Sequence, residues 1–321
     1  MKLVTFAIPV IRPDLLERCL ETLYKYTDLL IFNVIVIDQT VQGMDIDRDA
    51  YPNLMVIRTP KSFRFHTGNV GFQKANNLAL SLTETPYFCF LNDDVEFIHP
   101  GWWDGVMDTF AKVEKATPTR PALLVNVASI KLPDWSVGKP AGEHHYILPY
   151  KEQYTDADWH SLTEEEHYVN EDLTIKPGTV IDGINLYCSV AKTDLLKKIG
   201  IDDRWWPGSA GDYDLCCLAS MWGYRCVGTT ASWVYHHWSV SFQAAQDEDD
   251  IRSLYMPELY EGDLRAKWGE RFDLWGVKCQ AIHAELLVCE QIMHTDDGVI
   301  ATCEKHPDTP YAIPPNLSTP L

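Results

Sequence analysis

The chain has 321 residues, 46% of them hydrophobic, which is enough for one large domain or two ordinary domains with a full core. Its net charge is −19 and its pI about 4.9, which argues against a non-specific grip on nucleic acid and against a basic surface on anionic lipid. No apolar stretch approaches the roughly 20 residues of a membrane span. Nine cysteines without a C-x-x-C pair indicate a reducing, cytoplasmic setting.

The N-terminal third alternates between strand and helix patterns. Short apolar runs predict strands at 3–8, 34–37, 55–57 and 87–91, and Pro9 is expected to end the first. One helix is predicted to open at Pro13, and a second has Phe72, Ala75, Leu78, Ala79 and Leu82 on one face. This β-α-β order predicts an α/β fold, a doubly wound and mostly parallel twisted sheet flanked by helices.

The second half of the chain has a less regular pattern. Residues 133–180 read as an insertion or long loops, after which a strand at 181–190 and a helix at 193–199 are predicted. A further helix runs from Asp214 to a C-terminal cap at Gly223. We predict a main domain at 1–243 and a C-terminal extension at 244–321, helical over 244–293 and ending in an extended, proline-rich tail.

Acidic residues follow two of the apolar runs, Asp38 after the second and Asp93 with Asp94 after the fourth. Ligands of open α/β sheets bind beyond the carboxyl ends of the strands, and hard divalent cations prefer oxygen ligands. Asp38 fits a strand-ending turn equally well. Two carboxylates after five apolar residues favour a site over a turn.

Three further groups have two interpretations each. One of Asp212 and Asp214 is expected to cap the helix that follows. His236 and His237 alternate in a strand-like run, so only one can face the site. Trp205 and Trp206 fit either an acceptor platform that stacks on a sugar or ordinary packing.

A resemblance emerges from the motifs taken together: Ala7-Ile8-Pro9-Val10, Ile37-Asp38-Gln39-Thr40, Asn69-Val70-Gly71-Phe72 with Asn76, Leu91-Asn92-Asp93-Asp94, Gly211-Asp212-Tyr213-Asp214-Leu215 and His236. Their order and spacing resemble the family 2 glycosyltransferases with the GT-A fold, especially the rhamnosyltransferase-like branch, over roughly residues 3–241. The resemblance implies an inverting transfer of a sugar from a nucleotide-diphosphate donor to a hydroxyl of a glycan or other acceptor, with bound Mn²⁺ or Mg²⁺.

The resemblance also implies roles for individual residues. Asp94 is the expected metal ligand, with Asp93 near the ribose or a metal-bound water and His236 near the metal and diphosphate. Asp212 is the expected catalytic base, which leaves the helix cap to Asp214. The donor pocket is expected to include Pro9, Asp38, which contacts the base of the nucleotide, Asn69, Gly71, Asn76 and Asn92.

Three positions depart from the family pattern. Asn92 stands at the first D-x-D position, Gly211 replaces one member of the usual acidic pair, and Gln39-Thr40 follows Asp38 in place of smaller polar residues. The missing carboxylate keeps open a catalytically inactive sugar-binding module. A nucleotidyltransferase is the other alternative, although the glycine-rich basic loop typical of that class is not found near the N-terminus.

Overall fold

The computed structural model describes residues 1–40, 42–60, 69–116, 118–130, 144–147, 180–182, 184, 186–205, 211–237, 267, 276–278, 281–282, 288–295, 298–303 and 306–313. The statements below concern these residues.

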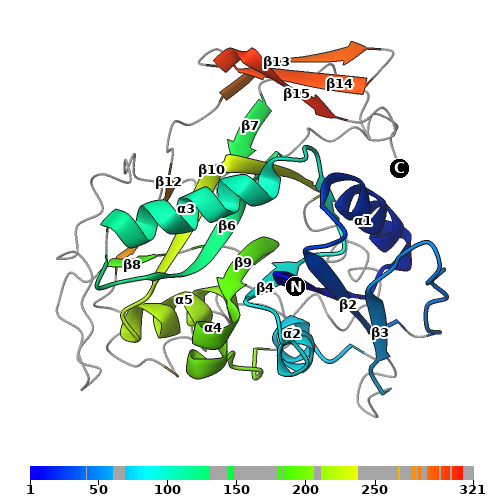
Figure 1. Ribbon diagram of the computed structural model, residues 1–321, viewed down its shortest axis with the longest axis vertical. Helices are drawn as coiled ribbons and strands as arrows, with labels where there is room; N and C mark the ends of the chain where they lie inside the picture. Colours follow the sequence, from blue (N-terminus) through cyan, green and yellow to red (C-terminus); the bar gives the residue numbers. More distant parts are fainter. Residues whose placement is uncertain are drawn as a thin grey trace.

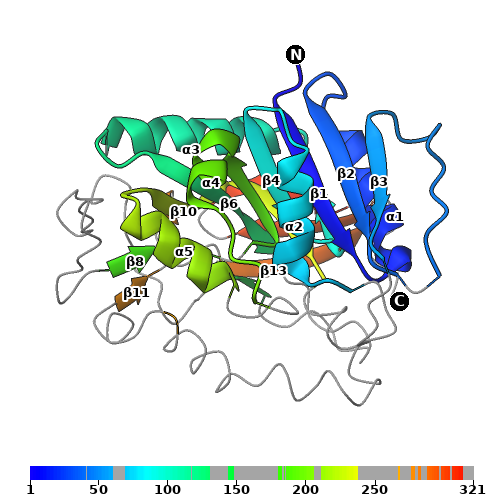
Figure 2. The same cartoon turned by 90° about the horizontal axis from the view of Figure 1, so that it is seen from below.

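A mixed, mostly parallel sheet runs through the molecule. Its parallel part has the order β3 (Leu54–Arg58), β2 (Phe32–Asp38), β1 (Val4–Val10) and β4 (Tyr87–Leu91), which Figure 2 shows side by side. Next to β4 lies the antiparallel β9 (Cys188–Lys192), followed by β6 (Ala122–Ile130). The strand β10 (Arg225–His236) runs parallel to β6.

Helices cover both faces of this sheet (Figure 1). On one face lie α1 (Pro13–Tyr26) and α3 (Trp102–Ala116); on the other lie α2 (Phe72–Ser81), α4 (Thr193–Ile199) and α5 (Gly211–Met221). Each face has its own buried apolar cluster, because strands such as β1 and β4 place alternate side chains on opposite sides. The predicted α/β sheet flanked by helices is confirmed.

The end of β10 brings a distant part of the chain to the carboxyl end of β4. The short strand β5 (Val95–Phe97) pairs antiparallel with β10, so that Val95 lies opposite His236. The turn of residues 92–94 connects β4 to β5 and therefore lies next to the last residues of β10. This pairing positions the acidic turn.

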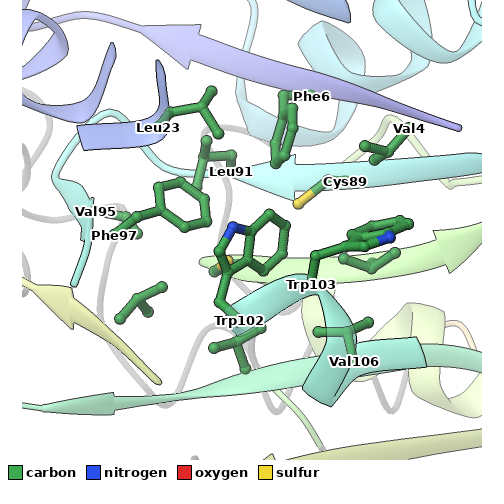
Figure 3. Close-up of a cluster of buried hydrophobic side chains, with 14 of the residues drawn as sticks. Val4, Phe6, Leu23, Cys89, Leu91, Val95, Phe97, Trp102, Trp103 and Val106 are labelled. Carbon is green, nitrogen blue, oxygen red and sulfur yellow. The ribbon is translucent and has the colours of Figure 1, made fainter. Parts of the chain in front are cut away.

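Trp102, the first residue of α3, packs into the apolar cluster between the sheet and the helices α1 and α3 (Figure 3). It is fully buried, and its ring centroid lies 4.7 Å from that of Phe97 and 5.8 Å from that of Phe6. Its indole Nε1 donates a hydrogen bond of 3.0 Å to Thr27 Oγ1, so the polar atom of the ring is satisfied. The neighbouring Trp103 is also buried, which makes packing the role of both tryptophans.

Two details of the predicted elements are wrong. Pro9 does not end β1, which continues to Val10 with Pro9 in register with Ile37; the missing N–H of proline is tolerated near the end of a strand. On α2, Leu78 and Leu82 are 38% and 48% exposed, whereas the polar Gln73 and Asn76 are buried. The buried face of α2 is therefore less apolar than its periodicity indicated.

The predicted C-terminal helices are not found in the described residues between 276 and 295. These form β11 (Gly276–Lys278), β12 (Ala281–Ile282) and β13 (Val288–Thr295), followed by β14 (Gly298–Cys303) and β15 (His306–Ile313). The strand β13 extends the main sheet through β7 (His144–Ile147), and β11 pairs with β8 (Val180–Asp182). Within the predicted extended tail, His306–Ile313 form β15, and the rest of 133–179 lies outside the described residues.

Six cysteines in the described part of the chain are buried free thiols, as expected for core residues (Cys19, Cys89, Cys188, Cys216, Cys217 and Cys226). No helix among the described residues has the length and apolar character needed to cross a bilayer.

We predict that Trp102→Ala lowers the free energy of unfolding by about 3–5 kcal/mol, because it leaves a large cavity and an unpaired Thr27 hydroxyl. Trp222→Ala is the matched control: Trp222 is 45% exposed, and its loss should change stability by less than about 1 kcal/mol. Urea unfolding followed by circular dichroism measures both. Equal losses for the two variants would contradict this account of the core.

Candidate active site

The acidic turn after β4 is buried although it carries two carboxylates. Asp93 and Asp94 are only 5% and 4% exposed. The backbone closes the turn from two sides: Asn92 N–H donates to Tyr187 O at 2.8 Å, and His237 N–H donates to Asp94 O at 3.0 Å. Buried charges need partners, so the surroundings of these two carboxylates define the site.

His236 is the partner of Asp94. Its Nε2 lies 3.1 Å from Asp94 Oδ1, and both side chains are less than 10% exposed. Burial opposes ionisation of Asp94, but the nearby His236 outweighs burial and holds the pKa of Asp94 below its usual value. His237 faces Glu96 instead, with Nε2 2.6 Å from Oε1. Of the two histidines, His236 is the one at the acidic turn.

Asp93 has the opposite electrostatic setting. Burial and the neighbouring charge of Asp94 raise the pKa of Asp93, and backbone N–H groups of Arg12 and Ile11 lower it in part. These donors come from the loop between β1 and α1. The pair therefore favours one ionised and one protonated carboxyl group near neutral pH.

The donor atoms at this turn fit part of a divalent metal site. A carboxylate oxygen and an imidazole nitrogen, Asp94 Oδ1 and His236 Nε2, lie side by side and suit Mn²⁺ or Mg²⁺ together with oxygen atoms from a ligand. Among the described residues, no cluster of three or more histidine, cysteine, aspartate or glutamate side chains could hold a metal. The described residues thus offer two candidate ligand atoms, and further atoms, such as oxygens of a bound phosphate or water, would have to complete the shell.

Asp212 lies in the first turn of α5, where its Oδ2 accepts the N–H of Leu186 at 3.2 Å. Burial raises the pKa of Asp212 to about 7, and the Leu186 N–H lowers it only in part. A carboxyl group with a pKa near 7 is suited to take up a proton at neutral pH.

The segment Leu186–Tyr187 connects the acidic turn with Asp212. Leu186 binds the Asp212 carboxylate, and the next residue, Tyr187, stacks on His236 with ring centroids 4.6 Å apart and planes at 21°. The Tyr187 carbonyl also accepts the N–H of Asn92. Two adjacent residues thus contact Asp212 on one side and, on the other, His236 and Asn92 next to the acidic turn.

The Asp38 carboxylate holds the loop that follows β2. Its Oδ1 accepts hydrogen bonds from the N–H and hydroxyl of Thr40 at 2.9 and 2.6 Å, and its Oδ2 accepts the N–H of Met44 at 3.0 Å. Arg58 lies 4.0 Å from Oδ2. This is the turn interpretation of Asp38; its contact with a nucleotide base stays a prediction.

Gln39 joins the ends of β1 and β2 to the start of α2. Its N–H donates to Val10 O at 2.9 Å, and its side-chain Oε1 accepts the N–H of Val70 at 2.8 Å. Gly71 caps α2 with a φ of 91°, a conformation that favours glycine, and its N–H donates to Asn69 Oδ1 at 2.9 Å. The glycine motif therefore lies at the same edge as Pro9 and Asp38.

Asn76 occupies a different environment from the other predicted donor-pocket residues. It is fully buried in α2, and its Nδ2 donates to Phe72 O at 2.9 Å. In this arrangement it supports the first turn of the helix, and direct contact with a donor stays a prediction.

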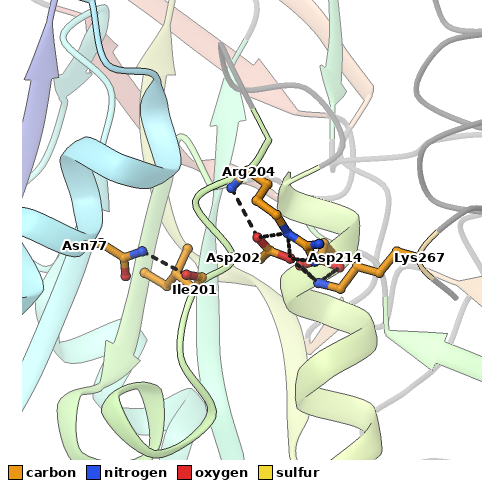
Figure 4. Close-up of polar contacts among 6 residues, drawn as sticks. All are labelled: Asn77, Ile201, Asp202, Arg204, Asp214 and Lys267. Atoms are coloured by element: carbon orange, nitrogen blue, oxygen red, sulfur yellow. Dashed lines mark hydrogen bonds and ion pairs between the residues drawn. The ribbon is translucent and has the colours of Figure 1, made fainter.

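Asp214 is not the helix cap, because α5 begins at Gly211. Instead, its carboxylate pairs with Lys267, whose Nζ lies 2.6 Å from Asp214 Oδ1 and 2.7 Å from Asp202 Oδ2 (Figure 4). Arg204 also binds Asp202, and these two hydrogen-bonding partners keep the pKa of Asp202 below its usual value. Lys267 links the C-terminal region to α5.

Trp205 lies beside the same network. It is 8% exposed, and Lys267 Nζ is 5.7 Å from the centre of its ring. An acceptor platform needs an open ring face, so packing is the role that this arrangement favours. Trp206 lies outside the described residues, and the acceptor role of both tryptophans stays a prediction.

With this geometry in place, comparison with known families is informative. Residues 7–165 match the sequence profile described as Glycosyl transferase family 2. This match agrees with the family resemblance that the motifs indicated, over about half of the chain. The sheet order and the family match together agree with the GT-A fold that the resemblance implied. Comparison with the curated proteins gives no significant match.

Solved structures give more distant likenesses. The mannosyltransferase PcManGT from Pyrobaculum calidifontis, in complex with GDP-Man and Mn²⁺, has 13% identity and a TM-score of 0.46 over 73% of this chain and 56% of that one. S. aureus TarS in complex with UDP has 14% identity and a TM-score of 0.43 over 73% of this chain and 60% of that one. The chain thus spans less than two thirds of the length of these proteins, and likenesses this distant do not bear on function.

Three residues of the site were missed as contributors by sequence reasoning. Gln39 was noted only as a departure from the family pattern, and Gln73 lies inside the Asn69–Asn76 motif without having been singled out. Tyr187 carries no sequence signal of its own, because its role depends on the tertiary contact with His236.

We predict that Asp212→Asn changes how stability depends on pH. An unfolded aspartate ionises near pH 4, whereas folded Asp212 keeps its proton to about pH 7, so the wild type loses stability as pH rises between these values. Relative to wild type, Asp212→Asn should gain up to about 1.4 kcal/mol per pH unit over that window and nothing more above it.

Urea unfolding of wild type and Asp212→Asn at pH 5, 6, 7 and 8 measures this difference. Asp194→Asn, which removes an exposed carboxylate from α4, is the control and should show no such slope. A constant difference between wild type and Asp212→Asn would mean that Asp212 titrates normally.

Proposed function

We propose that this protein is an inverting, divalent-metal-dependent glycosyltransferase that moves a hexose or deoxyhexose from a nucleotide-diphosphate donor to an acceptor hydroxyl. One observation carries the proposal. The segment Leu186–Tyr187 touches Asp212 on one side and, through the ring of His236, the buried Asp94 on the other. A proton acceptor and a pair of metal-ligand atoms thereby share one neighbourhood at the carboxyl edge of the sheet.

Asp94 and His236 would hold the cation, with Asp93 beside it, and the cation would offset the negative charge that develops on the leaving diphosphate. The edge loops would hold the donor: Pro9 and Asn92 border it, the loop organised by Asp38 lies nearest the base, and Asn69 with Gly71 lies at the start of α2, where a helix N-terminus favours phosphate.

Asp212 would take the proton of the acceptor hydroxyl. Its raised pKa places a substantial share of the ionised form at neutral pH while keeping it basic enough to accept a proton. In the proposed transfer, Oδ1 of Asp212 would accept the proton, because Oδ2 already accepts the N–H of Leu186. Attack from the face opposite the leaving group would follow from the position of this base relative to the donor edge.

Two rival functions make different predictions in one assay. Purified protein is incubated with a panel of UDP-, GDP- and dTDP-sugars and Mn²⁺, and nucleoside diphosphate is measured. Slow release supports transfer, binding without release supports a catalytically inactive sugar-binding module, and pyrophosphate release from a nucleoside triphosphate with a sugar phosphate supports a nucleotidyltransferase.

We predict that Asp94→Ala abolishes the Mn²⁺-dependent part of donor binding, because it removes one of the two ligand atoms in the described site. Isothermal titration calorimetry with nucleoside diphosphates, with and without Mn²⁺, measures this. Asp104→Ala removes an exposed carboxylate at the start of α3 and should bind as wild type does. Unchanged affinity in Asp94→Ala would overturn the metal assignment.

We predict that Asp212→Asn keeps donor affinity within about twofold of wild type and lowers turnover by about 10²–10⁴-fold, the usual contribution of a general base. Asparagine has almost the same shape but cannot accept the proton. Calorimetry and nucleoside-diphosphate release measure the two quantities on the same preparation. Retained turnover would place the base elsewhere.

A further inference from the structure

The side chain of Gln73 occupies the space above Gly211. Gln73 is the second residue of α2, and it is 1% exposed. A Cβ atom added to Gly211 would lie 1.8 Å from Gln73 Nε2 and 2.2 Å from Gln73 Cδ, far inside any real contact distance. The φ of Gly211 is not in the left-handed region, so it is the close approach of Gln73 that requires glycine here.

This contact joins the starts of two helices that carry the two halves of the site. Gln73 follows Gly71 and Phe72, in the segment that Gln39 fixes to the strand ends through Val70. Gly211 directly precedes Asp212. A hydrogen bond also joins α2 to the loop that leads toward α5: Asn77 Nδ2 donates to Ile201 O at 2.8 Å (Figure 4).

We propose that Gln73 is a positioning residue for Asp212, and that its buried side chain fixes the first turn of α5 against the start of α2. The inference deepens the proposed function, on which it rests, because it concerns how the same base is held. The atoms nearest to the space above Gly211 all belong to Gln73, so its loss would remove the closest packing partner of this turn.

The chemical type of this side chain also matters. A carboxylate at position 73 would place a negative charge next to Gly211, one residue before Asp212, and raise the pKa of Asp212 further. A short side chain would admit water next to Asp212 and relieve the burial that raises its pKa. An amide fills the space and carries no charge, so it maintains a proton acceptor that titrates near neutral pH.

The packing contact is tested by a double-variant cycle in thermal unfolding. Gly211→Ala in the wild-type background forces Gln73 out of place and should lower Tm by several degrees. In the Gln73→Ala background the same change should leave Tm unchanged or raise it, since alanine is the better helix former. Gly101→Ala, whose added Cβ would meet only His99 Nδ1 at 3.6 Å, is the control and should have the same effect in both backgrounds.

The positioning role is tested by a readout that packing alone would not move, the titration of the Asp212 carboxyl carbon in protein labelled with ¹³C at aspartate Cγ. Asp212→Asn assigns the resonance. Gln73→Ala should lower the titration midpoint toward the usual aspartate value, and Gln73→Glu should raise it by about one unit or more. Leu78→Glu adds the same charge one turn along α2 at an exposed position and should leave the midpoint unchanged.

Neither measurement needs a sugar donor, so the inference and the proposed function can fail separately. The positioning role would be overturned, even in an active enzyme, by either of two results. One is that the Tm effects of the substitutions at positions 73 and 211 simply add. The other is that the titration midpoint of Asp212 stays the same in all variants at position 73. A non-additive cycle with the shifts described here would uphold it even if no nucleotide sugar were turned over, in which case the proposed function alone would fall.

Discussion

Two carboxylates buried side by side at the end of β4 are the constraint around which this edge of the molecule is arranged. Adjacent buried charges of one sign are costly, and here the cost is offset unequally: Asp94 has His236 at 3.1 Å, whereas Asp93 accepts backbone N–H groups and keeps a raised pKa. The histidine can reach this turn only because β5 pairs antiparallel with the end of β10. The strand pairing and the charge balance therefore depend on each other, and a site that tolerates excess negative charge is also one that a divalent cation would stabilise.

Much of the first half of the fold could be predicted from the sequence, because its signals are local. Apolar runs predict β2 and β4, and a proline predicts the start of α1. The sequence also predicts where Asp38 and Asp94 lie, because both follow the carboxyl ends of parallel strands. Pro9 was misjudged because its missing N–H matters less at the end of a strand than within it. On α2, two leucines suggested a buried stripe, but the neighbours of the helix cover Gln73 and Asn76 instead. Which face of a helix is buried depends on tertiary packing, and sequence periodicity alone does not determine it.

In the candidate site, too, local patterns could be predicted from the sequence and long-range contacts could not. Residue types and order identify Asp94, Asp212 and His236, but their roles depend on contacts between segments that local patterns do not relate. Tyr187 has no motif, yet it stacks on His236 and is joined through Leu186 to Asp212. Asp214 had the sequence position of a helix cap, and it was displaced from that role by a helix that starts three residues earlier and by a lysine more than fifty positions away. Single-sequence reasoning could not weigh that lysine against a capping bond.

The start of α5 shows how these long-range contacts combine. Asp212 lies between three restraints: the N–H of Leu186 on its own carboxylate, Gln73 packed over the residue before it, and Lys267 bound to Asp214 two residues after it. They come from the strand side of the sheet, from α2 and from the C-terminal region. Because Lys267 and Arg204 together offset the charges of Asp214 and Asp202, these two carboxylates are balanced without involving Asp212. Asp212 is thus left as the carboxylate of this turn whose pKa is set mainly by burial, which brings it near the neutral value that suits a general base.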